Sequence, residues 1–184
     1  MLELLMRIIS GTRRGKLLIE KVDDTTRPTT DRVRENVFNV LANLVKFQGA
    51  RVLDLFAGTG GYGLEAFSRG AAEVILNDLD KQALKVLKQN CELVHFNGTV
   101  LNLDFRVVLE KYRSEKFDII FLDPPYESDY IQIALDVIVQ QEMLSHGGVI
   151  VIESGKQLKI PSLVFKNYGR AWLYFVNPNW QPLQ

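Results

Sequence analysis

Strands and helices alternate from about residue 50 onward, and this alternation constrains the fold more than any other feature. Apolar segments predict strands at 51–55, 73–77, 99–103, 117–122 and 149–153. Helical spacing predicts helices between them at 60–70, 80–93, 105–113 and 128–140. Such βαβ units form a parallel sheet with helices on both faces. We therefore predict an α/β fold built on a mostly parallel sheet.

The two ends of the chain predict additions to this sheet. Strands at 7–10 and 16–20 flank the basic turn Gly11-Thr12-Arg13-Arg14-Gly15, which indicates an N-terminal β-hairpin. An amphipathic helix is expected at 31–46. Segments 163–166 and 171–176 predict a second hairpin that adds an antiparallel strand at the sheet edge. We expect one domain over 1–184, with 1–30 a basic arm and 31–184 the body.

The composition excludes several kinds of protein. Cys91 is the one cysteine of the sequence, so neither an internal disulfide nor a CxxC pair is possible. His95 and His146 are isolated and form no HExxH pattern, so we predict no metal site. No apolar stretch reaches the roughly 18 residues of a membrane-spanning helix. We expect a protein of the reducing cytoplasm that does not enter the membrane.

Charge is unevenly distributed, although the net charge is zero. Residues 1–34 contain eight lysines and arginines against five acids. A basic arm indicates a polyanionic partner such as RNA, and a solvated hairpin without a partner is the alternative. The candidate phosphate contacts are Arg7, Arg13, Arg14, Lys16, Arg27 and Arg32. Arg27, Arg32 and Arg34 have a second interpretation, in which they line the mouth of a site or pair with Asp and Glu side chains across the fold.

A glycine-rich loop after the strand at 51–55 is the first candidate ligand site. Residues 58–63 contain four glycines, nominally in the GxGxxG pattern of dinucleotide-binding loops. However, Asp54 precedes the loop, where it would repel a pyrophosphate and suit the positive amino-acid end of S-adenosylmethionine. Asp78, 20 residues after Gly58, has the spacing of an acid that accepts ribose hydroxyls. Asp104 is placed either to accept the adenine amino group or to cap a helix.

The second candidate site is Asp123-Pro124-Pro125-Tyr126, directly after the apolar strand at 117–122. Proline fixes its own φ near −65° and favours an extended conformation in the residue before it. The segment therefore predicts a stiff, polar lip at the open end of a strand. Such a lip suits a flat, weakly nucleophilic substrate such as the amino group of a nucleobase.

Taken together, four segments resemble the class I S-adenosylmethionine-dependent methyltransferases, and most closely the bacterial 16S ribosomal RNA guanine-N2 methyltransferases (RsmD-like). The segments fall in the expected order between residues 6 and 126, and the second is long and specific to the family. They are Met6–Gly11 with Arg14-Gly15-Lys16, Arg27–Glu35, Asp54–Gly60 with Gly63–Ala66, and Asp123–Tyr126. Glu153, after the fifth strand, also fits the family pattern, whereas Gly61-Tyr62 departs from it.

The resemblance implies a Rossmann-like, seven-stranded fold and methylation of a guanine N2 amine in 16S rRNA. The implied catalytic residues are Asp123, Pro124, Pro125 and Tyr126: Asp123 and the Pro124 carbonyl would accept the amine N–H groups, and Tyr126 would stack on the base. The implied S-adenosylmethionine contacts are Asp54, Phe56, Ala57, Gly58, Thr59, Gly60, Gly63, Asp78, Leu79, Asp104 and Phe105.

Other functions remain open at the level of sequence. A related amino methyltransferase could act on another RNA base or on adenine N6 in DNA, although the chain has no dedicated DNA-recognition domain. An NAD-dependent oxidoreductase would use the glycine loop but leave Asp123–Tyr126 unexplained. A non-catalytic RNA-binding assembly factor is the third alternative. The expected partner is 16S rRNA or a small-subunit assembly particle, and the expected state is a monomer.

Overall fold

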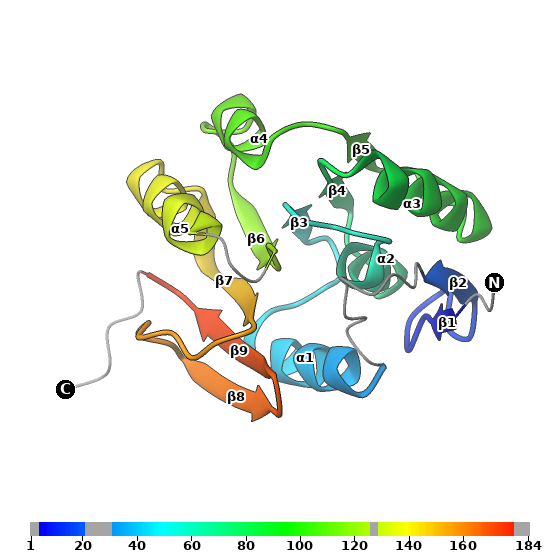
Figure 1. Ribbon diagram of the computed structural model, residues 1–184, viewed down its shortest axis with the longest axis horizontal. Helices are drawn as coiled ribbons and strands as arrows, with labels where there is room; N and C mark the ends of the chain where they lie inside the picture. The colour runs from blue at the N-terminus through cyan, green and yellow to red at the C-terminus, as the bar shows by residue number, and fades with distance from the viewer. Residues whose placement is uncertain (1–3, 21–30, 126–128, 179–184) are drawn as a thin grey trace.

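A seven-stranded, mostly parallel sheet forms the centre of the protein in the computed structural model, which describes residues 4–20, 31–125 and 129–178 (Figure 1). The strand order is β5-β4-β3-β6-β7-β9-β8. The five parallel strands are β5 (Thr99–Leu101), β4 (Glu73–Asn77), β3 (Arg51–Asp54), β6 (Phe117–Leu122) and β7 (Leu144–Ser154). β9 (Ala171–Val176) runs antiparallel to both β7 and the edge strand β8 (Val164–Tyr168). The predicted α/β class and antiparallel edge are confirmed.

Helices cover both faces of this sheet (Figure 1). One face is covered by α1 (Asp31–Leu44), α2 (Gly61–Ser68) and α3 (Lys81–Leu93), and the other by α4 (Phe105–Lys111) and α5 (Tyr130–Gln140). Alternate residues of a strand point to opposite faces, so β6 contributes Ile119 and Phe121 to the first core and Ile120 and Leu122 to the second. None of the helices in the described ranges is long and apolar enough to span a membrane.

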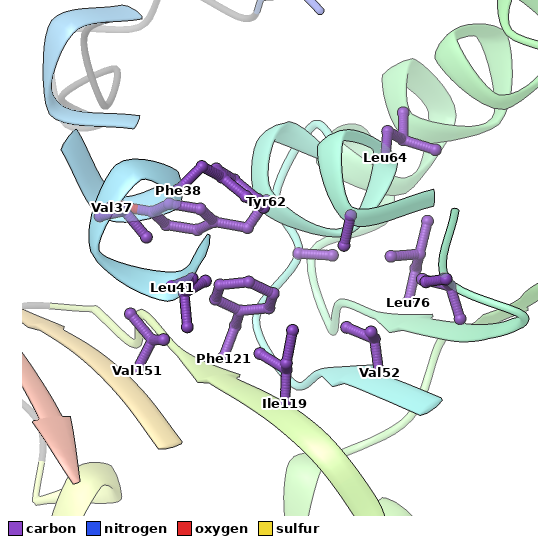
Figure 2. Close-up of a cluster of buried hydrophobic side chains, with 14 of the residues drawn as sticks. Val37, Phe38, Leu41, Val52, Tyr62, Leu64, Leu76, Ile119, Phe121 and Val151 are labelled. Atoms are coloured by element: carbon purple, nitrogen blue, oxygen red, sulfur yellow. The ribbon is translucent and has the colours of Figure 1, made fainter. Parts of the chain in front are cut away.

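Aromatic side chains join three elements of the first core. The ring of Phe121 on β6 stacks on Tyr62 of α2, with centroids 5.0 Å apart, and Phe38 of α1 packs against both (Figure 2). Phe121 is the last residue but one of β6, and Asp123 follows the end of this strand. The lip predicted from the sequence therefore rests on rigid core packing.

The N-terminal hairpin is present, and its first strand is displaced from the prediction. β1 (Leu4–Arg7) pairs with β2 (Leu17–Glu20) in a separate two-stranded sheet, so pairing begins at residue 4 rather than 7. Residues 8–16 form the connection, in which the Ile8 N–H donates to the Lys16 carbonyl. The connection is therefore longer than predicted, and Lys16, expected at the start of the second strand, lies within it.

Candidate active site

An acidic residue lies at or just after the carboxyl end of each of the five parallel strands, so that five acids line the carboxyl edge of the sheet. They are Asp104 after β5, Asp78 after β4, Asp54 at the end of β3, Asp123 after β6 and Glu153 near the end of β7. The chain changes direction across the sheet between β3 and β6, which are adjacent. Ligands of open α/β sheets bind at such a switch point. We call these five residues the acidic edge.

The glycine loop wraps around Asp54 and Asp78 rather than around an open anion cradle. The Gly63 N–H donates to Asp54 Oδ2 (3.0 Å), and the Gly58 N–H donates to Asp78 Oδ2 (2.7 Å). The Gly60 N–H donates to the Ala57 carbonyl. These backbone donors are occupied by oxygens of the protein, so the loop is not arranged to hold a pyrophosphate. This geometry disfavours the NAD-dependent alternative.

Asp54 is buried and only partly satisfied. Its Oδ1 atom makes no hydrogen bond of good geometry to any of residues 4–20, 31–125 or 129–178. Burial, and to a smaller extent the charge of Asp78, raise the pKa of Asp54 to about 7, although the N–H of Gly63 opposes the shift. A buried, unsatisfied carboxyl oxygen beside a glycine loop fits a cationic ligand such as the amino-acid end of S-adenosylmethionine.

Backbone conformation explains one glycine of the loop, and close packing explains another. Gly60 has φ +99°, a left-handed conformation that glycine adopts without strain. A Cβ on Gly63 would lie 2.0 Å from Leu76 Cδ2 and 3.2 Å from Asp54 Oδ2. Glycine at this position lets α2 approach β4 and β3 closely, which fixes the Asp54 carboxylate.

The remaining predicted cofactor contacts divide into edge and core positions. Asp78 is half-buried, and beside it Leu79 is 63% exposed, which presents an apolar side chain at the edge of the sheet. Asp104 caps α4 through the Arg106 N–H and also pairs with the Arg106 guanidinium, which lowers its pKa to about 2. Both roles suggested for Asp104 remain compatible, since a carboxylate accepts several hydrogen bonds. Phe105 is buried against Phe56, so it supports the site from the core.

The loop residues between these positions take part in hydrogen bonds that hold the backbone of the site. The Ala57 N–H donates to the carbonyl of Asn77, and Ala57 is buried. Thr59 is half-buried, and its carbonyl accepts a hydrogen bond from Asn90 of α3. The side-chain amide of Asn77 donates to the carbonyls of Leu55 and Leu103. Asn77 therefore ties three strand ends together, which sequence reasoning did not anticipate.

Asp123 lies among the other acids of the edge. Burial and the negative charges of Glu153, Asp54 and Asp78 raise its pKa well above the ordinary value. Pro124 is buried and Pro125 is exposed, so the lip runs from the core to the surface. Tyr126 lies outside the described residues, and its stacking role stays a prediction.

A pocket of about 230 Å³ opens beside this lip. Its walls come from Pro124 and Pro125, from the start of α5, and from the segment 153–160 after β7. Lys156 and Lys159 are exposed at its rim, and neither side chain has an ion pair among the residues described. Sequence reasoning missed both lysines, because two isolated lysines in a loop carry no recognisable pattern.

The hairpin is attached to the body by buried side chains of α2 and α3. Glu65, fully buried, accepts hydrogen bonds from the N–H groups of Ile9 (2.7 Å) and Ser10 (3.0 Å) and pairs with Arg69. Asn90 both accepts from and donates to the backbone of Ile19. The hairpin is therefore held by the same two helices that frame the glycine loop.

The predicted RNA-binding residues differ in how available they are. Arg14, Lys16 and Arg32 are exposed. The Arg13 guanidinium donates to the Val94 carbonyl and lies over the Phe67 ring, and Arg7 lies 3.5 Å from Asp31. Arg27 lies outside the described residues.

Arg34 is buried and pairs with Asp31, three residues earlier on the same helix rather than across the fold. Its guanidinium also donates to the Arg7 carbonyl and the Met6 sulfur. It therefore anchors β1 to α1.

Comparisons with known proteins bear on the family and the fold. Residues 6–170 match the family model described as conserved hypothetical protein 95. The chain belongs to this family. A relative from Bacillus subtilis, named putative rRNA methyltransferase YlbH, is 38% identical over 163 residues, covering 86% of this chain and 88% of that protein.

Two further comparisons also match proteins that are named as methyltransferases. The ribosomal RNA small subunit methyltransferase D of Escherichia coli K12 is 34% identical over 159 residues, covering 86% of this chain and 79% of that protein. A solved structure, the putative methyltransferase yhhF from Escherichia coli, superposes with a TM-score of 0.77 at 30% identity, covering 93% of this chain and 96% of that one. The resemblance stated from the sequence and the predicted enzyme class are confirmed.

The described residues contain no group of three or more His, Cys, Asp or Glu side chains arranged to hold a metal ion.

Proposed function

We propose that this protein transfers the methyl group of S-adenosylmethionine to the N2 amine of a guanine in 16S ribosomal RNA. The observation that carries the proposal is the position of the Asp123-Pro124-Pro125 lip beside the glycine loop. Leu55, directly after β3, donates its N–H to the Phe121 carbonyl, so the two segments leave adjacent strands. The names of the relatives support ribosomal RNA as the substrate.

The acidic edge holds the methyl donor. Asp54 takes the positive amino-acid end, and Asp78 takes the ribose hydroxyls. When bound, S-adenosylmethionine supplies a methyl group on a positively charged sulfur. A nearby positive charge favours the ionised forms of Asp54 and Asp123, whose pKa values are raised without it.

The lip prepares the acceptor amine. Its lone pair is delocalised into the guanine ring, which makes it a weak nucleophile. Asp123 and the carbonyl of Pro124 accept hydrogen bonds from the two N–H groups of the amine. These hydrogen bonds localise the nitrogen lone pair and direct it at the methyl group. Asp123, ionised beside the positively charged donor, then takes the proton that the methylated amine releases.

Replacing Asp123 tests this assignment. Asp123→Ala should bind S-adenosylmethionine in calorimetry while methyl transfer to small-subunit particles or 16S rRNA falls on the order of 100-fold or more. Glu110→Ala, on the exposed side of α4, is the control and should keep both properties. Full activity of Asp123→Ala would contradict the proposal. Mapping the methylated nucleotide then separates guanine N2 from the alternative bases, and absence of transfer to any RNA would favour the assembly-factor alternative.

A further inference from the structure

Glu153 lies beside the catalytic lip without a role in the chemistry described so far. β6 and β7 are parallel, and Leu122 pairs with Ile152, so the next residues, Asp123 and Glu153, leave adjacent strands side by side. Glu153 is 4% exposed and lines the pocket next to Pro124 and Pro125. Its place in the sheet puts Glu153 next to any base that is presented to Asp123.

The Glu153 carboxylate is held by Tyr62. The Tyr62 hydroxyl donates to Glu153 Oε2 at 2.6 Å, and the contact is buried. The Tyr62 ring is fixed in turn by stacking on Phe121 at an interplanar angle of 6° (Figure 2). An ionised carboxylate can accept about four hydrogen bonds, so the bond from Tyr62 orients Glu153 without exhausting its capacity as an acceptor.

The hydrogen-bond donors and acceptors on the edges of the bases indicate which base this carboxylate can recognise. Guanine presents two donors side by side on its Watson–Crick edge, the N2 amine and N1–H. Adenine presents its N6 amine beside an unprotonated N1, whose lone pair would face a carboxylate unfavourably. Enzymes that extrude a base read this edge by hydrogen bonds. Two neighbouring carboxylates therefore match guanine and oppose adenine.

We propose that Glu153, oriented by Tyr62, accepts the N1–H of the target guanine and thereby selects guanine over bases that lack this proton. The inference rests on the proposed function and deepens it, because it assigns base choice to one side chain. Glu153 is then a specificity residue that touches the substrate, and Tyr62 is a positioning residue.

The test uses rRNA fragments that carry either guanine or 2-aminopurine at the nucleotide mapped above. 2-Aminopurine keeps the 2-amino group but has an unprotonated N1. The wild-type protein should methylate guanine at least on the order of 100-fold faster, because a site built to bond a proton rejects an analogue that lacks it.

Glu153→Gln should reverse the preference. Tyr62 holds the amide oxygen, and the amide N–H₂ then donates to N1 of 2-aminopurine. Tyr62→Phe keeps the ring and loses only the hydroxyl. It should bind S-adenosylmethionine as the wild type does and discriminate less between the two bases. If Glu153→Gln does not fold, the Tyr62→Phe variant still tests the role of Glu153 in base selection.

The outcomes separate the two proposals. Wild-type protein that binds the donor but methylates neither RNA overturns the proposed function. Wild-type protein that methylates the guanine RNA, together with variants whose preference is unchanged, leaves the proposed function intact and overturns the role of Glu153.

Discussion

At the scale of single residues, Gly63 decides how precisely Asp54 is placed. Its missing side chain lets α2 approach within van der Waals contact of Leu76, and its N–H holds the Asp54 carboxylate. Gly63→Ala should cost about 1–3 kcal/mol of unfolding free energy, since an added methyl group must displace packed atoms. We also expect weaker binding of S-adenosylmethionine, measured by calorimetry, because Asp54 would be displaced.

A neighbouring glycine provides the matched control for this change. A Cβ on Gly61, in the same helical turn, would come no closer than 3.5 Å to the Met6 sulfur. Gly61→Ala should therefore leave donor binding nearly unchanged. Equal losses in the two variants would show that helix α2 as a whole, rather than the contact with Asp54, controls binding.

At the scale of elements, the attachment of the hairpin depends on Glu65. This buried carboxylate satisfies two backbone N–H groups of the hairpin and the guanidinium of Arg69. Glu65→Ala leaves those donors without an acceptor, so we expect a loss of about 3–5 kcal/mol in urea unfolding. Limited proteolysis should cut the variant between the hairpin strands before it cuts the body.

Glu65→Gln distinguishes lost hydrogen bonds from lost helix packing. The amide keeps one acceptor oxygen and the size of the side chain, so the variant should lose less stability than Glu65→Ala. If both variants resist proteolysis as the wild type does, Glu65 is not what holds the hairpin.

At the scale of the whole molecule, the acidic edge makes stability depend on pH. Asp54 has a pKa of about 7 in the folded protein and about 3.8 when unperturbed. Between these values the unfolded chain ionises while the folded protein stays protonated, so the unfolding free energy of the ligand-free protein should fall as pH rises. Below this window Asp54 is protonated in both states, and above it ionised in both.

Urea unfolding of the wild type and Asp54→Asn across this pH range measures the contribution. The difference in unfolding free energy between the two proteins should shift in favour of Asp54→Asn as pH rises from about 4 to 7, and should then level off. A difference that is constant with pH would contradict the raised pKa.

Local patterns in the sequence were enough for the alternating strands and helices of the central βαβ units and for the placement of Asp123 directly after β6. The strand β7 begins five residues earlier than predicted, at Leu144, because the polar run Ser145-His146-Gly147-Gly148 hides it and the pairing with β6 is irregular there. The hydrogen bond between Tyr62 and Glu153 joins residues that are 91 positions apart in the sequence. Glu65 accepts hydrogen bonds from backbone N–H groups, which any residue type except proline can supply. No local pattern reports such contacts.

The five acids at the edge of the sheet also bear on what happens after the reaction. Transfer turns a positively charged sulfonium into a neutral thioether, and in the proposed mechanism Asp123 also takes up the proton that the amine releases. The attraction between edge and ligand is therefore stronger before the transfer than after it. We expect the spent donor to leave more readily than fresh donor does, which favours the exchange of spent donor for fresh donor.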